Sequence, residues 1–246
     1  MSYLSLSLLL GVAAGVANVF GGAIVYARPW RRPLLVTFIG IGSGFMLATV
    51  LTEMAPESIR LLPAQAPVLI LAGYFLVHLS EHCWPAHFHF GEETHVEAFL
   101  RPGMAYTALG GLLVHTFFDG VAITSGFLVS RWLGTVISGA ILLHNIPEGF
   151  TISSVMLAAQ QSRRAGFYAV AGLALSRIVG ILAMSAARRE VKAGLALSAG
   201  VTLYVAASDL IPEVNKMSGL KVALAVGVGV GLVVLLRAIF FAQLTP

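Results

Sequence analysis

The chain has 246 residues, of which 58% are hydrophobic and 11% are charged, and its mean hydropathy is +0.89. A soluble domain carries roughly 25% charged residues, so the composition excludes a water-soluble globular protein and predicts a single membrane domain over residues 1–246. The net charge of +4 is too small to indicate nucleic-acid binding, and one cysteine, Cys83, excludes an internal disulfide.

Eight apolar stretches are long enough to cross a bilayer, which takes about 20 residues of helix. They are 4–27, 35–55, 66–84, 105–130, 133–159, 165–187, 193–214 and 220–243. The runs are continuously apolar, which favours helices over the alternating segments of a membrane barrel. The predicted fold is therefore all-α, a polytopic bundle of eight transmembrane helices.

Two internal repeats organise these stretches. Residues 43–57 resemble residues 199–213 at a constant offset of 156, which relates the second stretch to the seventh. Two such helices cross the membrane in opposite directions, as in inverted-repeat transporters. The runs HTFFDG at 115–120 and HNIPEG at 144–149 relate the fourth stretch to the fifth. The repeats predict three helices, a central pair and three inverted helices; the alternative is chance similarity among glycine- and leucine-rich helices.

Ionisable residues are concentrated in the central pair. His115 and Asp119 are four residues apart, as are His144 and Glu148, so each couple lies on one helical face. The connection near 130–131 is short, so the two helices are antiparallel neighbours. Their nitrogen and oxygen donors suit zinc, iron or manganese. A lone ionisable group at the bilayer centre costs at least ~2.5 kcal/mol, and four at one depth predict a bound cation. The alternative is two histidine–carboxylate hydrogen bonds that hold the helices together.

The HNIPEG run, preceded by HxxxDG on the previous stretch, resembles the ZIP family of divalent metal transporters, and the resemblance covers the whole chain. It implies an eight-helix bundle of three, two and three helices, with the metal site between helices four and five. It implies that His115, Asp119, His144 and Glu148 bind the metal, and that Asn145 belongs to a second, adjacent site found in some members.

The sequence departs from the two-metal members of that family. Thr116 stands where those members often have asparagine, and Arg177 aligns with a position that can supply a glutamate. A fixed guanidinium repels a second cation, so we expect one bound metal with Arg177 as its counter-charge. The alternative is an arginine that reaches the membrane interface.

Acidic residues of the inverted repeat predict a pathway. Glu53 and Asp209 each precede a Pro-Glu pair near a helix end, and by the resemblance they lie along the route of the ion. Together with Thr116 they are expected to line this pathway. The alternative for the two acids is solvation at the helix ends.

The segment at about 81–104 contains several histidines, and a cytosolic histidine-rich loop is common here in the ZIP family. His82, His87 and His89 are therefore candidate ligands of a loose metal-binding loop. The alternative is a solvated loop without this role.

Basic residues set the predicted orientation. With both termini outside, the inner loops hold eight Lys and Arg residues and the outer loops hold five, while Arg177 and Arg237 lie within spans. This excess favours extracytoplasmic termini, in the plasma (inner) membrane.

The predicted function is transport of divalent metal ions towards the cytoplasm, with Zn²⁺ as the main substrate and Fe²⁺, Mn²⁺ or Cd²⁺ as further ones. No organic cofactor, nucleic-acid partner or enzymatic activity is expected; the partners are the metal ions and the lipid bilayer, with a homodimer left open. One alternative is an intramembrane metal-dependent hydrolase with the same ligands, although the HExxH run is absent. Another is a metal sensor or structural protein without flux.

Overall fold

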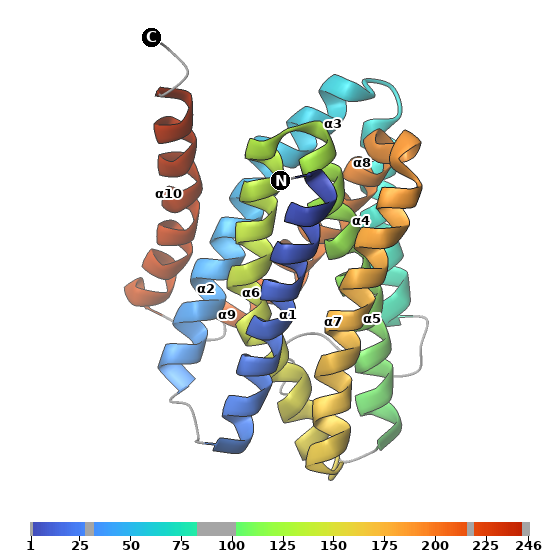
Figure 1. The fold of residues 1–246 in the computed structure, drawn as a ribbon. Coiled ribbons are helices and arrows are strands. Elements are labelled where there is room, and N and C mark those ends of the chain that lie inside the picture. The colour runs from blue at the N-terminus through green and yellow to red at the C-terminus, as the bar shows by residue number, and fades with distance from the viewer. Residues whose placement is uncertain (1, 28–31, 83–101, 216–218, 243–246) are drawn as a thin grey trace.

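The computed structural model describes residues 2–27, 32–82, 102–215 and 219–242, and every regular element in these ranges is a helix (Figure 1). The all-α prediction is therefore confirmed for this part of the chain. The long helices are α1 (Tyr3–Ala27), α2 (Arg32–Thr49), α4 (Ala66–His82), α5 (Pro102–Val129), α6 (Arg131–Ala158), α7 (Arg163–Ala186), α8 (Val191–Tyr204) and α10 (Leu220–Ala242). The short helices are η1 (Val50–Met54), α3 (Ala55–Leu61), η4 (Arg188–Glu190), η5 (Val205–Leu210) and α9 (Ile211–Asn215).

The protein is an integral membrane protein. Within the described residues, six helical segments are long and apolar enough to cross a membrane: Tyr3–Tyr26, Val36–Leu61, Ala108–Val129, Arg163–Ala186, Arg188–Leu210 and Leu220–Phe240. Large apolar side chains such as Val16, Phe167 and Leu175 are more than half exposed on these helices, which a lipid environment explains and water does not. The predicted third stretch forms a shorter apolar helix, Ala66–Ser80, and the predicted fifth stretch, which forms α6, is not among the six segments. Eight spans and the 3+2+3 arrangement therefore stay predictions.

Serine caps explain the tight connections around α6. The side chain of Ser130 accepts a hydrogen bond from the backbone N–H of Leu133, and that of Ser162 accepts one from Ala165, both at 3.1 Å. Each serine therefore satisfies one of the unpaired N–H groups at a helix start. As a result α5 and α6 are antiparallel neighbours joined through Ser130.

Glycines at equivalent positions of the inverted repeat form close helix contacts. An added Cβ at Gly44 of α2 would overlap the carbonyl oxygen of Val226 in α10, and one at Gly200 of α8 would overlap that of Ile70 in α4. The pairs α2–α10 and α8–α4 therefore pack in the same way, backbone against backbone. Residues 156 positions apart thus make equivalent helix contacts.

The repeat also shares an irregular turn. The chain winds into a π-helical turn at η1 and again at η5, and these turns carry Glu53 and Asp209 respectively. π-Helical turns inside α-helices are rare and occur often at functional sites. The prediction that the second helix ends before Pro56 was wrong, because α3 extends the helix to Leu61. Pro56 lacks the N–H that would bond the carbonyl oxygen of Thr52 in a regular helix, and Arg237 donates a hydrogen bond of 3.1 Å to that oxygen instead.

Candidate metal site

The central helices bring three predicted ligands together. The Nε2 atoms of His115 and His144 are 3.4 Å apart, and the Oδ2 atom of Asp119 lies 3.7 Å and 3.6 Å from them. Among the described residues, these form a group of His, Cys, Asp or Glu donors whose ligand atoms lie within 4.8 Å of one another. The centre of this triangle is about 2.1 Å from each atom, which matches zinc–nitrogen and zinc–oxygen bond lengths.

A backbone contact orients His144. Its Nδ1 atom lies 2.9 Å from the carbonyl oxygen of Ala140, one helical turn earlier. A carbonyl only accepts hydrogen bonds, so Nδ1 carries the proton, and in the neutral ring the lone pair is on Nε2. The nitrogen that faces His115 and Asp119 is therefore the one able to bind a metal. Such a fixed second contact is typical of metal-binding histidines.

A buried arginine lies against this triangle. Arg177 of α7 is fully buried. Its Nη2 atom lies 3.4 Å from Asp119 Oδ2 and 3.5 Å from Glu148 Oε2, and it donates a hydrogen bond of 3.0 Å to Asn145 Oδ1. Asn145 in turn donates from Nδ2 to the carbonyl oxygen of Ala14 in α1. The guanidinium thus occupies the space between the side chains of Asp119, Glu148 and Asn145.

Glu148 is apart from the triangle. It is almost fully buried and forms an ion pair with Arg177, and neither of its carboxylate oxygens has a hydrogen-bond partner among the described residues. Asp119 Oδ1 and His115 Nδ1 also lack such a partner. Buried polar atoms are nearly always satisfied by protein, water or an ion. The cluster therefore contains carboxylate oxygens and an imidazole nitrogen that no described side chain satisfies.

Glycines set the depth at which these side chains meet. An added Cβ at Gly120, next to Asp119, would overlap the carbonyl oxygen of Arg177; one at Gly149, next to Glu148, would overlap that of Asn18 in α1. Both glycines therefore allow close approach between helices. The contact at Gly120 draws α7 towards α5 and holds Arg177 at the level of Asp119.

The predicted pathway residues lie outside the triangle. Thr116 is fully buried, and its hydroxyl donates to the carbonyl oxygen of Leu112 in its own helix, at 2.9 Å. Asp209 is 3% exposed within η5. His82 is the last residue of α4, whereas His87 and His89 lie outside the described residues.

Glu53 has partners that the sequence did not indicate. Its carboxylate accepts a hydrogen bond of 2.9 Å from Trp132 Nε1 and lies 3.4 Å from Arg237 Nη1. The indole of Trp132 stacks on Phe240, with ring centroids 4.4 Å apart. Glu53 and these partners border a cavity of about 410 Å³ at the end of the bundle where α5 meets α6. No spacing in the sequence relates Glu53 to partners so far along the chain.

Comparison with known proteins identifies the family. The family model described as ZIP Zinc transporter matches residues 93–237, more than half of the chain. The chain belongs to the ZIP family. The match includes both central helices and the helix that carries Arg177.

Named ZIP relatives resemble the chain to different extents. It is 29% identical over 260 residues to Zinc transporter ZIP9-B of Xenopus laevis, covering 85% of each chain. It is 32% identical over 133 residues to Zinc transporter ZIP13 of Gallus gallus, which is 50% of this chain and 36% of the relative. It is 32% identical over 127 residues to Metal cation symporter ZIP14 of Mus musculus, which is 47% of this chain and 26% of the relative. The chain thus spans well under half the length of the last two proteins.

Proposed function

We propose that this protein transports divalent metal ions, zinc foremost, across the plasma (inner) membrane towards the cytoplasm. The triangle formed by His115, Asp119 and His144 carries this proposal, because its centre lies at zinc-bonding distance from all three donor atoms. The names of the ZIP relatives, as zinc transporters and a metal cation symporter, support the same substrate class. The same donors also suit Fe²⁺, Mn²⁺ and Cd²⁺ as substrates.

Glu148 is the proposed fourth ligand. It follows His144 by one helical turn, and its carboxylate is held back from the triangle by Arg177 at 3.5 Å. A rotation of the Glu148 side chain would break its ion pair with Arg177 and bring its carboxylate to the metal. Zinc in proteins is usually four-coordinate, so this exchange would complete the site when an ion arrives.

Arg177 is the proposed counter-charge of the empty site. With neutral histidines, the buried charges are two carboxylates and one guanidinium, so the empty site carries one net negative charge and the metal-bound site one net positive charge. Arg177 thus keeps the net charge of the buried site at a magnitude of one both with and without the metal. A small net charge lowers the free-energy cost of burying either state in a low-dielectric interior. Because Arg177 also occupies the space beside Asn145, we propose that one metal binds and that Asn145 orients Arg177.

The acids of the two π-helical turns are the proposed pathway. Glu53 borders the cavity at one end of the bundle, and Asp209 occupies the corresponding position of the inverted copy. Thr116, one residue from His115, is the proposed pathway residue closest to the site. The predicted orientation puts Glu53 on the outer side and makes it the entrance, in a single transport domain of eight helices arranged as 3+2+3. The intramembrane hydrolase is not favoured, because the named relatives are transporters.

Uptake of radioactive zinc by the purified full chain in proteoliposomes tests the proposal. His144→Ala and Glu148→Ala should each abolish uptake, while Arg164→Ala, a change at an exposed position, should leave it intact. Size-exclusion profiles and circular dichroism of the purified variants control for folding. Zinc uptake by folded His144→Ala at the wild-type rate would refute the assignment.

A further inference from the structure

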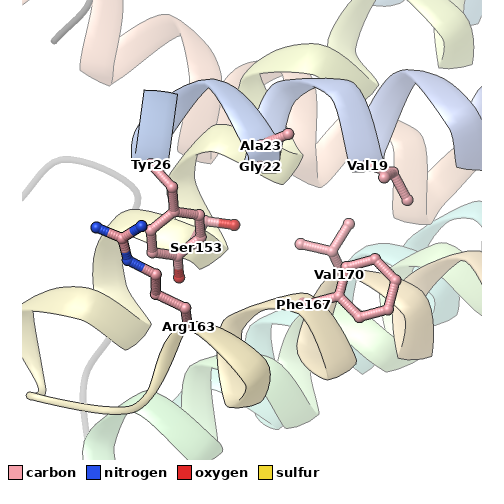
Figure 2. Close-up of a pocket in the computed structure, with 8 residues that line it drawn as sticks. All are labelled: Val19, Gly22, Ala23, Tyr26, Ser153, Arg163, Phe167 and Val170. Atoms are coloured by element: carbon pink, nitrogen blue, oxygen red, sulfur yellow. The ribbon is translucent and has the colours of Figure 1, made fainter. Parts of the chain in front are cut away.

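An amphipathic groove lies between α1, α6 and α7, and none of its lining residues belongs to the metal-binding triangle (Figure 2). Its volume is about 270 Å³. Val19, Val170 and Phe167 line one end, and the other end gathers Tyr26, Ser153 and Arg163. The cavity is slightly smaller than the ~300 Å³ at which small-molecule pockets begin. It therefore has room for a chain segment of a ligand and not for a whole lipid.

The groove opens towards the lipid at the membrane interface. Phe167, which lines it, is 55% exposed, and neighbouring Phe20 of α1 is 57% exposed. α1 ends at Ala27, and α7 begins at Arg163, so the polar end of the groove lies at the helix ends and the apolar end lies within the spans. An occupant must therefore be polar at the interface and apolar below it.

Two hydroxyl groups at the polar end are unsatisfied. Ser153 is 1% exposed, and its Oγ atom, like the buried hydroxyl of Tyr26, has no hydrogen-bond partner among the described residues. A buried polar group without a hydrogen-bond partner is energetically unfavourable. Glycines make room for both, since an added Cβ at Gly22 would overlap Ser153 Oγ and one at Gly166 would overlap the Tyr26 hydroxyl. Both oxygens are closed off from water, so a small movement of the Tyr26 and Ser153 side chains is needed before an occupant of the groove can accept hydrogen bonds from them.

A cation lies beside these hydroxyls. The guanidinium carbon of Arg163 lies 5.7 Å from the centre of the Tyr26 ring, within the range of a cation–π contact. Arg163 is also the first residue of α7, and a helix N-terminus is electropositive and binds anions. Arginine binds phosphate through paired hydrogen bonds. The charge at the mouth of the groove therefore selects an anionic group at the level of the lipid headgroups.

We propose that this groove binds one anionic phospholipid. Its phosphate contacts Arg163, its ester carbonyls accept hydrogen bonds from Tyr26 and Ser153, and the first part of one acyl chain lies between Val19, Val170 and Phe167. Basic pockets between helices are a recurrent way to bind such headgroups. This lipid is wedged between α1, α6 and α7, the helices that carry the Ala14–Asn145–Arg177 contacts. Its binding does not depend on the identity of the transported ion.

Native mass spectrometry of the purified full chain in detergent tests the proposal. Phosphatidylglycerol and phosphatidylcholine with identical acyl chains are compared on the wild type, Arg163→Ala and Arg164→Ala. Arg164 is the matched control, because it is the adjacent exposed arginine and does not line the groove. We expect the wild type and Arg164→Ala to retain phosphatidylglycerol at least tenfold more strongly than phosphatidylcholine, and Arg163→Ala to lose this preference.

A second variant tests the apolar part of the groove. Ala23 lines the groove and is exposed, so Ala23→Phe should fill the space without disturbing the core. We expect it to retain neither lipid. Inorganic phosphate at millimolar concentration should not displace phosphatidylglycerol from the wild type. The proposal is overturned by equal losses in Arg163→Ala and Arg164→Ala, by equal retention of the two lipids, or by displacement with free phosphate. Undiminished retention by Ala23→Phe would also overturn it, and if this variant does not fold, the arginine pair decides.

Discussion

Replacing Arg177 with alanine should tighten metal binding and slow its release. A zinc ion at the centre of the triangle would lie within about 5.5 Å of Arg177 Nη2, because that atom is 3.4 Å from Asp119 Oδ2 and zinc–oxygen bonds measure about 2.0–2.2 Å. At this separation a doubly charged ion and a guanidinium repel each other by about 6 kcal/mol at an effective dielectric constant near 20. Water and side-chain rearrangement will offset most of this repulsion. We expect a net gain of at least about 1.4 kcal/mol, which lowers Kd at least tenfold.

The same variant should destabilise the metal-free protein. Without Arg177, the buried carboxylates of Asp119 and Glu148 lose their cation, and removing one partner of a buried ion pair costs roughly 3–5 kcal/mol. Bound zinc supplies the missing positive charge. The increase in thermal stability caused by zinc should therefore be larger in Arg177→Ala than in the wild type.

Titration calorimetry in detergent and thermal unfolding, with zinc and with a chelator, measure both effects. Arg164→Ala, an exposed position, is the control for loss of one positive charge. In Arg177→Glu, a new carboxylate beside Asn145 and Glu148 should raise the zinc content per chain from one towards two by elemental analysis. Unchanged or weaker zinc binding by Arg177→Ala, or two zinc ions per wild-type chain, would refute the role of Arg177 as counter-charge.

Three further predictions concern protons, the entrance and helix packing. Histidine must be neutral to bind metal and titrates near ~6.5 when unperturbed, so zinc affinity should fall as the pH is lowered from 7.5 to 5.5; a flat profile would contradict histidine ligation. Arg237→Ala removes the cation 3.4 Å from Glu53 and should lower the KM for zinc uptake a few-fold with kcat unchanged, whereas exposed Arg131→Ala should not; equal effects would indicate a general surface charge. Gly149→Ala places a Cβ against the backbone of Asn18 and should destabilise the protein by about 1–3 kcal/mol, seen as a lower unfolding temperature; Gly227→Ala, where nothing lies within 4 Å, should not.

The spacing of residues along the chain was enough to predict the helices and the faces on which the metal ligands lie. A helix places residues four apart on one face whatever surrounds it, so the sequence alone predicted that His115 with Asp119, and His144 with Glu148, share a face. Apolar length predicted α1 closely, since Tyr3–Ala27 matches the predicted stretch 4–27, but it missed the continuation of the second helix to Leu61. The repeats were also readable, because the offset of 156 pairs residues of similar type without any knowledge of the fold.

Contacts between helices were decided only by the tertiary structure. The convergence of His115, His144 and one oxygen of Asp119, with Glu148 drawn to Arg177, depends on helix rotation and depth, which the glycine contacts at Gly120 and Gly149 set. Glu53 illustrates the limit most clearly. Its contacts with Trp132 and Arg237 join residues 79 and 184 positions apart, and no periodicity in an apolar helix encodes which neighbour it meets. Helix propensity and hydropathy act along one segment, whereas close packing between segments selects the partners of each buried charge.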